Sequence, residues 1–174
     1  KHLLHVVRSI ETIKDLLSRY FIGLIIQISI LFVIYTSLLT IFEIENPIII
    51  AFLCASLNLI PYLGPMMGGV IMFILTTTNN LDLDFRTEIL PNTLYIMAGY
   101  TIAQLIDNFI SQPIIFSRSI KSHPLEIFIV ILVFGNLFGV LGMVISIPAY
   151  TAIKVIAKEF FNKYKAIKLL TKDF

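Results

Sequence analysis

The chain has 174 residues, of which 57% are hydrophobic and only 14% are charged. An ordinary soluble domain carries about 25% charged residues, so this composition excludes that class and predicts an all-α, polytopic membrane protein. The net charge of +2 is too small to indicate a nucleic-acid partner, and a single cysteine, Cys54, excludes a disulfide within this chain.

Residues 1–19 combine apolar and charged positions with a helical period. Charged side chains fill one face, and the apolar positions recur at spacings of three and four: Leu3, Leu4, Val7, Ile10, Ile13, Leu16 and Leu17. This pattern predicts an amphipathic helix that lies on the membrane surface. A helix that connects two spans would show the same pattern, and both interpretations remain open.

Residues 20–42 form the longest apolar run, about 23 residues interrupted only by Gln27 and a few small hydroxyl side chains. Because about 20 apolar residues cross the hydrocarbon core as a helix, this run predicts the first full transmembrane span. We expect Gln27 to form a hydrogen bond with a neighbouring helix.

The next apolar segment is broken in its middle, over residues 58–69, by Pro61, Gly64 and Pro65. Its two limbs hold roughly 10 to 14 residues each, too few to span the membrane. Such a pair predicts a re-entrant helical hairpin, whose bent backbone needs protein or a water-filled cavity to satisfy its polar groups. Two short, tilted spans packed through glycine are the alternative.

A polar loop is predicted over residues 79–92, and a second full span over residues 93–116. Unlike the first span, this one carries polar side chains on a single helical face, because their spacings are three, four and seven. They are Gln104, Asp107, Asn108 and Ser111. A carboxyl group at membrane depth usually faces a cavity or a partner. A purely structural pairing of Asp107 with Arg118 or Lys121 is the alternative.

A basic loop over residues 117–124 leads to a second broken apolar segment. Its limbs are residues 125–133 and 143–155, and the break between them carries Gly135, Gly139 and Gly142. This arrangement predicts a second re-entrant hairpin, although small residues at such spacing also serve ordinary helix packing.

The distribution of basic residues gives the orientation. If both broken segments return to the side that they entered, every basic cluster except the lone Arg86 lies on the cytoplasmic side. If each were a full span, the fit would be worse. The transport domain, residues 20–157, then holds an inverted repeat of span plus hairpin, 20–78 and 93–157. The surface helix at 1–19 and a basic cytoplasmic tail at 158–174 flank it.

Several ordered motifs resemble the autoinducer-2 exporter family of bacterial permeases. They are Leu59-Ile-Pro-Tyr-Leu-Gly-Pro65, Asp107-Asn-Phe-Ile-Ser-Gln-Pro113, His123-Pro-Leu125, the glycine run at 135–142 and Ile147-Pro-Ala149. The resemblance implies a multi-pass transporter of the bacterial inner membrane, a homo-oligomer that moves a small solute or exchanges ions. Family members are longer, so we expect this chain, which begins at Lys1, to be part of a longer protein.

The leading hypothesis is a secondary transporter with alternating access, since inverted repeats with interrupted helices are typical of that class. The solute, or a coupling H+ or Na+, would contact the predicted site residues Asn58, Pro61, Gly64, Pro65, Gln104, Asp107, Asn108, Gly135, Gly139 and Gly142. A passive channel and a non-transporting membrane scaffold are the alternatives. The sequence contains no nucleophile–base set, metal cluster or phosphate-binding loop, so we expect no enzymatic activity, catalytic residue, metal or cofactor.

Overall fold

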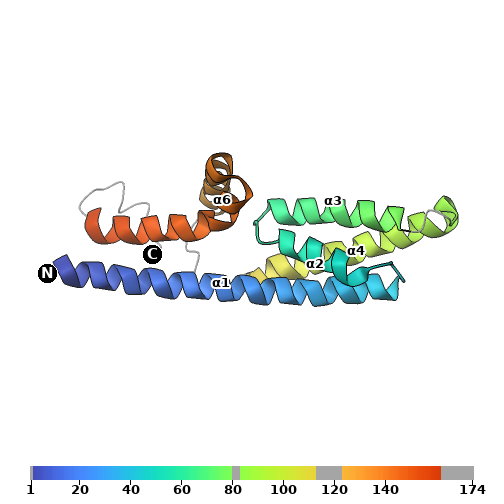
Figure 1. Cartoon of the computed structure of the whole chain (residues 1–174), viewed down its shortest axis with the longest axis horizontal. Coiled ribbons are helices and arrows are strands. Elements are labelled where there is room, and N and C mark those ends of the chain that lie inside the picture. Colours follow the sequence, from blue (N-terminus) through green and yellow to red (C-terminus); the bar gives the residue numbers. More distant parts are fainter. Residues whose placement is uncertain (1, 80–82, 113–122, 162–174) are drawn as a thin grey trace. The chain divides into compact units, whose positions relative to one another are not determined.

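The computed structural model describes residues 2–79, 83–112 and 123–161, and all the regular structure in these ranges is helical (Figure 1). The all-α prediction is therefore confirmed. The chain divides into two compact units, Leu24–Ile114 and Lys1–Gly23 with Ile115–Phe174, and each is described by itself.

Helix α1 (His2–Ile41) is one uninterrupted helix of 40 residues, so the surface helix at 1–19 and the first span are continuous. No proline occurs in this stretch, so every peptide group after the first turn can donate to the ladder. At 1.5 Å per residue the helix is about 60 Å long, about twice the thickness of the hydrocarbon core. About half of α1 therefore extends beyond it.

Helices α2 (Pro47–Leu57) and α3 (Leu63–Thr78) form an antiparallel hairpin in the unit Leu24–Ile114. At its open end the Glu45 amide donates to Asn79 Oδ1 over 3.1 Å. Near its tip a Cβ on Gly64 would lie 2.0 Å from the carbonyl oxygen of Leu57, so only glycine permits this approach. The chain reverses between the two helices at Tyr62, which has a φ of 65°.

The second span begins earlier than the sequence predicted. Helical turns start at η1 (Phe85–Ile89) and continue through α4 (Leu90–Ile106) and η2 (Asp107–Ser111), so the prediction of a loop up to residue 92 is wrong. Asp84 explains the start, because its Oδ1 accepts hydrogen bonds from the Arg86 and Thr87 amides. The first and last turns, η1 and η2, are wider π-type turns, which often occur at functional sites.

The core of this unit forms where the second half of α1 packs antiparallel against α4. Tyr35 stacks on Tyr100 with ring centroids 5.1 Å apart, and Phe42 stacks on Tyr95 at 6.1 Å. In Figure 1, α2 and α4 lie between α1 and α3. The buried apolar core contains Leu31, Tyr35, Leu39, Ile44, Ile50, Ala51, Cys54, Ala55, Met72, Ile96, Tyr100 and Ala103.

Helix α6 (Pro124–Phe161) folds back on itself at Gly139, which has a φ of 65° and a ψ of −150°. Lys154 Nζ lies 2.8 Å from Glu126 Oε2, although 28 positions separate the two residues. In a straight helix that separation would be about 42 Å, so the two limbs of α6 lie side by side.

Among the described residues, three helical stretches are long and apolar enough to cross a membrane: Ile10–Ile41, Phe85–Ser111 and Leu125–Ala157. Large apolar side chains point outward along them, as lipid-facing residues do, among them Ile41, Phe109 and Leu141. The first two stretches contain residues 20–41 and 93–111 of the two predicted full spans, whereas the third includes the reversal at Gly139. The end of the predicted second span (113–116), Arg118 and Lys121 of the basic loop, and residues 162–174 of the tail lie outside the described residues.

Candidate functional site

Gln104 of α4 is the centre of a buried polar cluster in the unit Leu24–Ile114. Its Nε2 lies 2.7 Å from Tyr35 Oη on α1, 3.1 Å from Asn58 Oδ1 at the tip of the α2–α3 hairpin, and 3.2 Å from Tyr100 Oη. An amide nitrogen carries only two hydrogens, so it can donate to two of these three oxygens at a time. Gln104 thereby connects the first span, the second span and the hairpin tip.

The hairpin tip is also held to the second span by Tyr100. Its hydroxyl donates to the carbonyl oxygen of Pro65 over 2.7 Å, and Asn58 Nδ2 donates to the carbonyl oxygen of Cys54 over 3.0 Å. Both bonds satisfy backbone carbonyls beside the break in the hairpin, as bent backbone at membrane depth requires. Pro61 lies in the turn between these two anchors, and Gly64 lies in the first turn of α3.

Asp107 is the centre of a second cluster, one helical turn beyond Gln104. Gln27 Nε2 and Gln112 Nε2 donate to the same oxygen, Asp107 Oδ2, over 2.7 Å and 2.9 Å. Gln112 also donates to Asn108 Oδ1 over 2.9 Å. The Asp107 side chain is 1% exposed, so its carboxyl group is held by amides inside the helix packing.

Each cluster contains one buried oxygen for which the described part of the chain provides no hydrogen-bond partner. These oxygens are Gln104 Oε1 and Asp107 Oδ1. A buried polar atom without a partner costs about 1–3 kcal/mol, so such atoms in a native fold require an explanation. Both are acceptors three positions apart on one helix face, and together they suit a ligand that carries N–H or O–H groups or a positive charge.

The structure brings together some of the residues predicted from the sequence. Asn58 and Gln104 are in direct contact, and Gln112 joins Asp107 to Asn108. The glycines predicted for the second tip, Gly135, Gly139 and Gly142, belong to the other unit.

Four contributors were missed as site residues: Gln27, Tyr35, Tyr100 and Gln112. Tyr100 could have been found, because it lies four positions before Gln104 and so on the same face of the second span. Tyr35 lies eight positions after Gln27, which also places both on one face of the first span. Tyrosines in an apolar run read as ordinary lipid-facing or core residues, so the sequence provided no sharper signal.

Helices able to span a membrane, outward-facing apolar side chains and a buried polar cluster at a broken hairpin define a multi-pass membrane protein. Residues 4–162 match the family model described as "AI-2E family transporter". The chain therefore belongs to this bacterial family, which consists of transporters and not of enzymes, and the resemblance seen in the motifs is confirmed.

Individual relatives support the same conclusion. The chain is 28% identical over 153 residues to "Putative transport protein YrrI" of Bacillus subtilis, covering 88% of this chain and 41% of the relative. It is 26% identical over 122 residues to "Putative transport protein YueF" of the same organism, covering 70% and 30%. Over 59 residues it is 37% identical to "Putative permease PerM" of Escherichia coli strain K12, covering 34% and 17%. The chain thus spans less than half of the length of these curated relatives.

Proposed function

We propose that this chain forms the substrate-translocating part of a secondary transporter in the bacterial cytoplasmic membrane. The observation that carries the proposal is the pair of buried, unpartnered acceptors, Gln104 Oε1 and Asp107 Oδ1, beside a broken hairpin. In this proposal the solute or the coupling ion binds there, in contact with Asn58 and with the hairpin tip that contains Pro61, Gly64 and Pro65. Gly135, Gly139 and Gly142 shape the second tip.

Alternating access follows from treating the α2–α3 pair and the folded α6 as re-entrant hairpins. The 11 residues of α2 and the 16 of α3 give lengths of about 17 and 24 Å, both short of the roughly 30 Å hydrocarbon core. On the rule that basic residues mark the cytoplasmic side, the first hairpin enters from outside and the second from the cytoplasm. Such an inverted repeat is typical of secondary transporters.

The ligand in this proposal is a small solute with hydrogen-bond donors, or a monovalent cation. Both unpartnered atoms accept hydrogen bonds, and Asp107 would repel an anion, so anionic solutes are disfavoured. Asp107 is the proposed H+ or Na+ coupling residue, with Asn108 beside it, because a membrane carboxyl group can exchange its charge as its exposure changes. A homo-oligomer in the lipid bilayer is part of the same proposal.

The test uses the full-length protein in liposomes that enclose a pH-sensitive dye, with an inward Na+ gradient imposed. We expect a change in internal pH that saturates with Na+ concentration, and its loss in Asp107→Asn. Glu88→Gln, which neutralises an exposed carboxylate at the start of the same span, is the matched control and should behave as wild type. Unchanged proton movement in Asp107→Asn would remove Asp107 from this role, and flux that does not saturate would favour a channel.

A further inference from the structure

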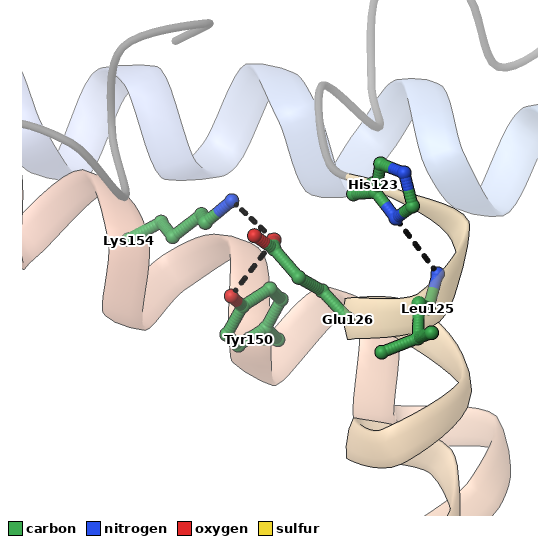
Figure 2. A network of polar contacts seen from close by, with 5 residues as sticks. All are labelled: His123, Leu125, Glu126, Tyr150 and Lys154. Atoms are coloured by element: carbon green, nitrogen blue, oxygen red, sulfur yellow. Dashed lines mark hydrogen bonds and ion pairs between the residues drawn. The ribbon is translucent and has the colours of Figure 1, made fainter.

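Glu126 and Lys154 form an ion pair between the two limbs of α6 (Figure 2). Their side chains are 32% and 6% exposed, so the lysine is almost completely buried. Tyr150, one turn before Lys154, donates its hydroxyl hydrogen to the same Glu126 oxygen over 3.1 Å. The Lys154 ammonium also lies 5.1 Å from the centre of the Tyr150 ring, within range of a cation–π interaction.

The local structure places Glu126 where it can meet these partners. Pro124 begins α6, and the Leu125 amide donates to Nδ1 of His123 over 3.3 Å, which turns the chain just before Glu126 (Figure 2). Glu126 therefore lies in the first turn of the helix, where the helix dipole favours a negative charge. Lys154 lies near the end of the returning limb, so the pair is at the open end of the hairpin.

Separating the limbs at this end would be unfavourable. The flanking positions on both limbs are apolar, with Ile127 and Val155 buried beside the two charges. Parting the limbs would break the ion pair of Lys154, whose side chain is only 6% exposed, and the hydrogen bond from Tyr150 to Glu126, which costs more than breaking a fully exposed pair. The charges therefore hold the open end closed.

The opposite end of the hairpin is constructed differently. Gly139 has backbone angles that only glycine adopts readily, and a Cβ built on it would have no neighbour within 4 Å. Its neighbours Leu137, Phe138, Val140 and Leu141 are all exposed. Below this tip the limbs touch closely again, because a Cβ on Gly142 would lie 2.1 Å from the carbonyl oxygen of Phe134.

We propose that Glu126, Tyr150 and Lys154 form a latch that keeps the open end of the α6 hairpin closed, so that conformational change in α6 is confined to the tip around Gly139. The hairpin then moves as one body up to its tip. This inference concerns a different unit from the proposed solute site, so either can fail without the other.

The experiment measures distances between pairs of spin labels by double electron–electron resonance in the full-length protein in liposomes. The background is Cys54→Ala, since Cys54 is the chain's only cysteine. One pair replaces Ile129 and Ile156, exposed residues on the two limbs towards the open end. The reference pair replaces Leu132 and Ile145, exposed residues nearer the tip.

In the unmutated latch we expect a single narrow distance distribution for the Ile129–Ile156 pair. Glu126→Gln or Lys154→Met should shift it to longer distances and broaden it, while the Leu132–Ile145 pair stays unchanged. The swapped variant, Glu126→Lys with Lys154→Glu, should restore the narrow distribution because the ion pair re-forms. Glu88→Gln, a charge removed elsewhere, should change neither pair.

Three results would overturn the latch. One is an unchanged Ile129–Ile156 distribution in both single variants. Another is a failure of the swapped variant to restore what the single variants lost. The third is a broad Ile129–Ile156 distance distribution while Glu126, Tyr150 and Lys154 are intact. This last result can be obtained even if the charge variants do not insert into the membrane.

Discussion

Gln27 and Asp107 are 80 positions apart in the chain, yet the amide of one donates to the carboxyl group of the other over 2.7 Å. The bond joins the first long helix to the end of the second, at a depth where both side chains are buried. It therefore makes the position of Asp107 depend on a residue outside its own span.

A double-mutant cycle tests this dependence. Gln27→Leu is expected to lower the free energy of unfolding by about 1–3 kcal/mol, because it leaves the buried carboxyl group with one donor fewer. Gln27→Leu with Asp107→Leu should cost less than the sum of the single changes, since no acceptor is then left unpaired. Reversible unfolding by denaturing detergent in mixed micelles measures the free energy of unfolding of the two single variants and the double variant.

The matched comparison pairs Gln27→Leu with Thr101→Val. Thr101 is exposed and its hydroxyl donates to the Met97 carbonyl of its own helix, so these two changes should be additive. If the changes in the free energy of unfolding for Gln27→Leu and Asp107→Leu also add up, the hydrogen bond between the two residues contributes nothing to stability.

Gly64→Ala is expected to disrupt the tip of the α2–α3 hairpin. The added Cβ would lie 2.0 Å from the Leu57 carbonyl oxygen, a rigid backbone atom, so the cost should reach the upper part of the roughly 1–3 kcal/mol of overpacking. Gly69→Ala is the control, because its Cβ would meet the Tyr100 ring at 3.2 Å, a side-chain contact that requires a shift of only a few tenths of an ångström. Thermal unfolding in detergent compares the stability of the two variants. An equal loss of stability in Gly64→Ala and Gly69→Ala would contradict the prediction.

Asp84 should control the first turn of the second span. Asp84→Ala removes the acceptor for the Arg86 and Thr87 amides, so hydrogen exchange over residues 85–89 should accelerate. Asp84→Asn keeps an acceptor oxygen and should exchange almost as slowly as wild type. If Ala and Asn at this position exchange alike, the cap is not what starts the helix.

The same cap predicts a pH dependence. Hydrogen bonds from the backbone and hydroxyl of Thr87, then from the Arg86 backbone, hold the pKa of Asp84 below its ordinary value of 3.8. Because the folded-state pKa is lower, the stabilisation is fully present above the unfolded-state pKa and is lost as pH falls through the folded-state pKa. The amide shift of Thr87, followed by NMR, should therefore titrate below pH 3.8. Titration above that value would contradict the cap.

Cysteine accessibility tests the re-entrant hairpin, in a Cys54→Ala background. A cysteine in place of exposed Tyr62, at the hairpin tip, should react much more slowly with a membrane-impermeant maleimide from the cytoplasmic side than one in place of His123. A cysteine in place of Glu45 should react from the outside only. If the tip cysteine reacts from the cytoplasm as fast as the cysteine at 123, α2 and α3 cross the membrane completely.

Local chemistry was enough to predict where the chain bends. Pro61 and Gly64 interrupt an apolar run, and the structure reverses there, at Tyr62. The second bend was predicted within residues 135–142, from three glycines between two short apolar limbs, and the chain folds back there at Gly139. Such breaks depend on the backbone conformations that glycine permits and on the backbone N–H that proline lacks. Both are properties of the residues at the break itself.

The start of the second span could not be predicted in the same way. Asp84, Arg86 and Glu88 read as a polar loop because their composition is polar, whereas the structure uses Asp84 as a helix cap. A cap and a loop have the same residue types, and only the backbone hydrogen bonds distinguish them.

The amino-acid sequence by itself determined that this is an all-helical membrane protein with two broken apolar segments and a polar face on its second span. Apolar run length, proline and glycine act over a few neighbouring residues, so these features can be read locally. Only the tertiary structure decided the partners: Tyr35 and Asn58 for Gln104, Gln27 for Asp107, and Lys154 for Glu126. Those contacts join residues 28 to 80 positions apart, and no local pattern states which distant side chain will satisfy a buried polar group.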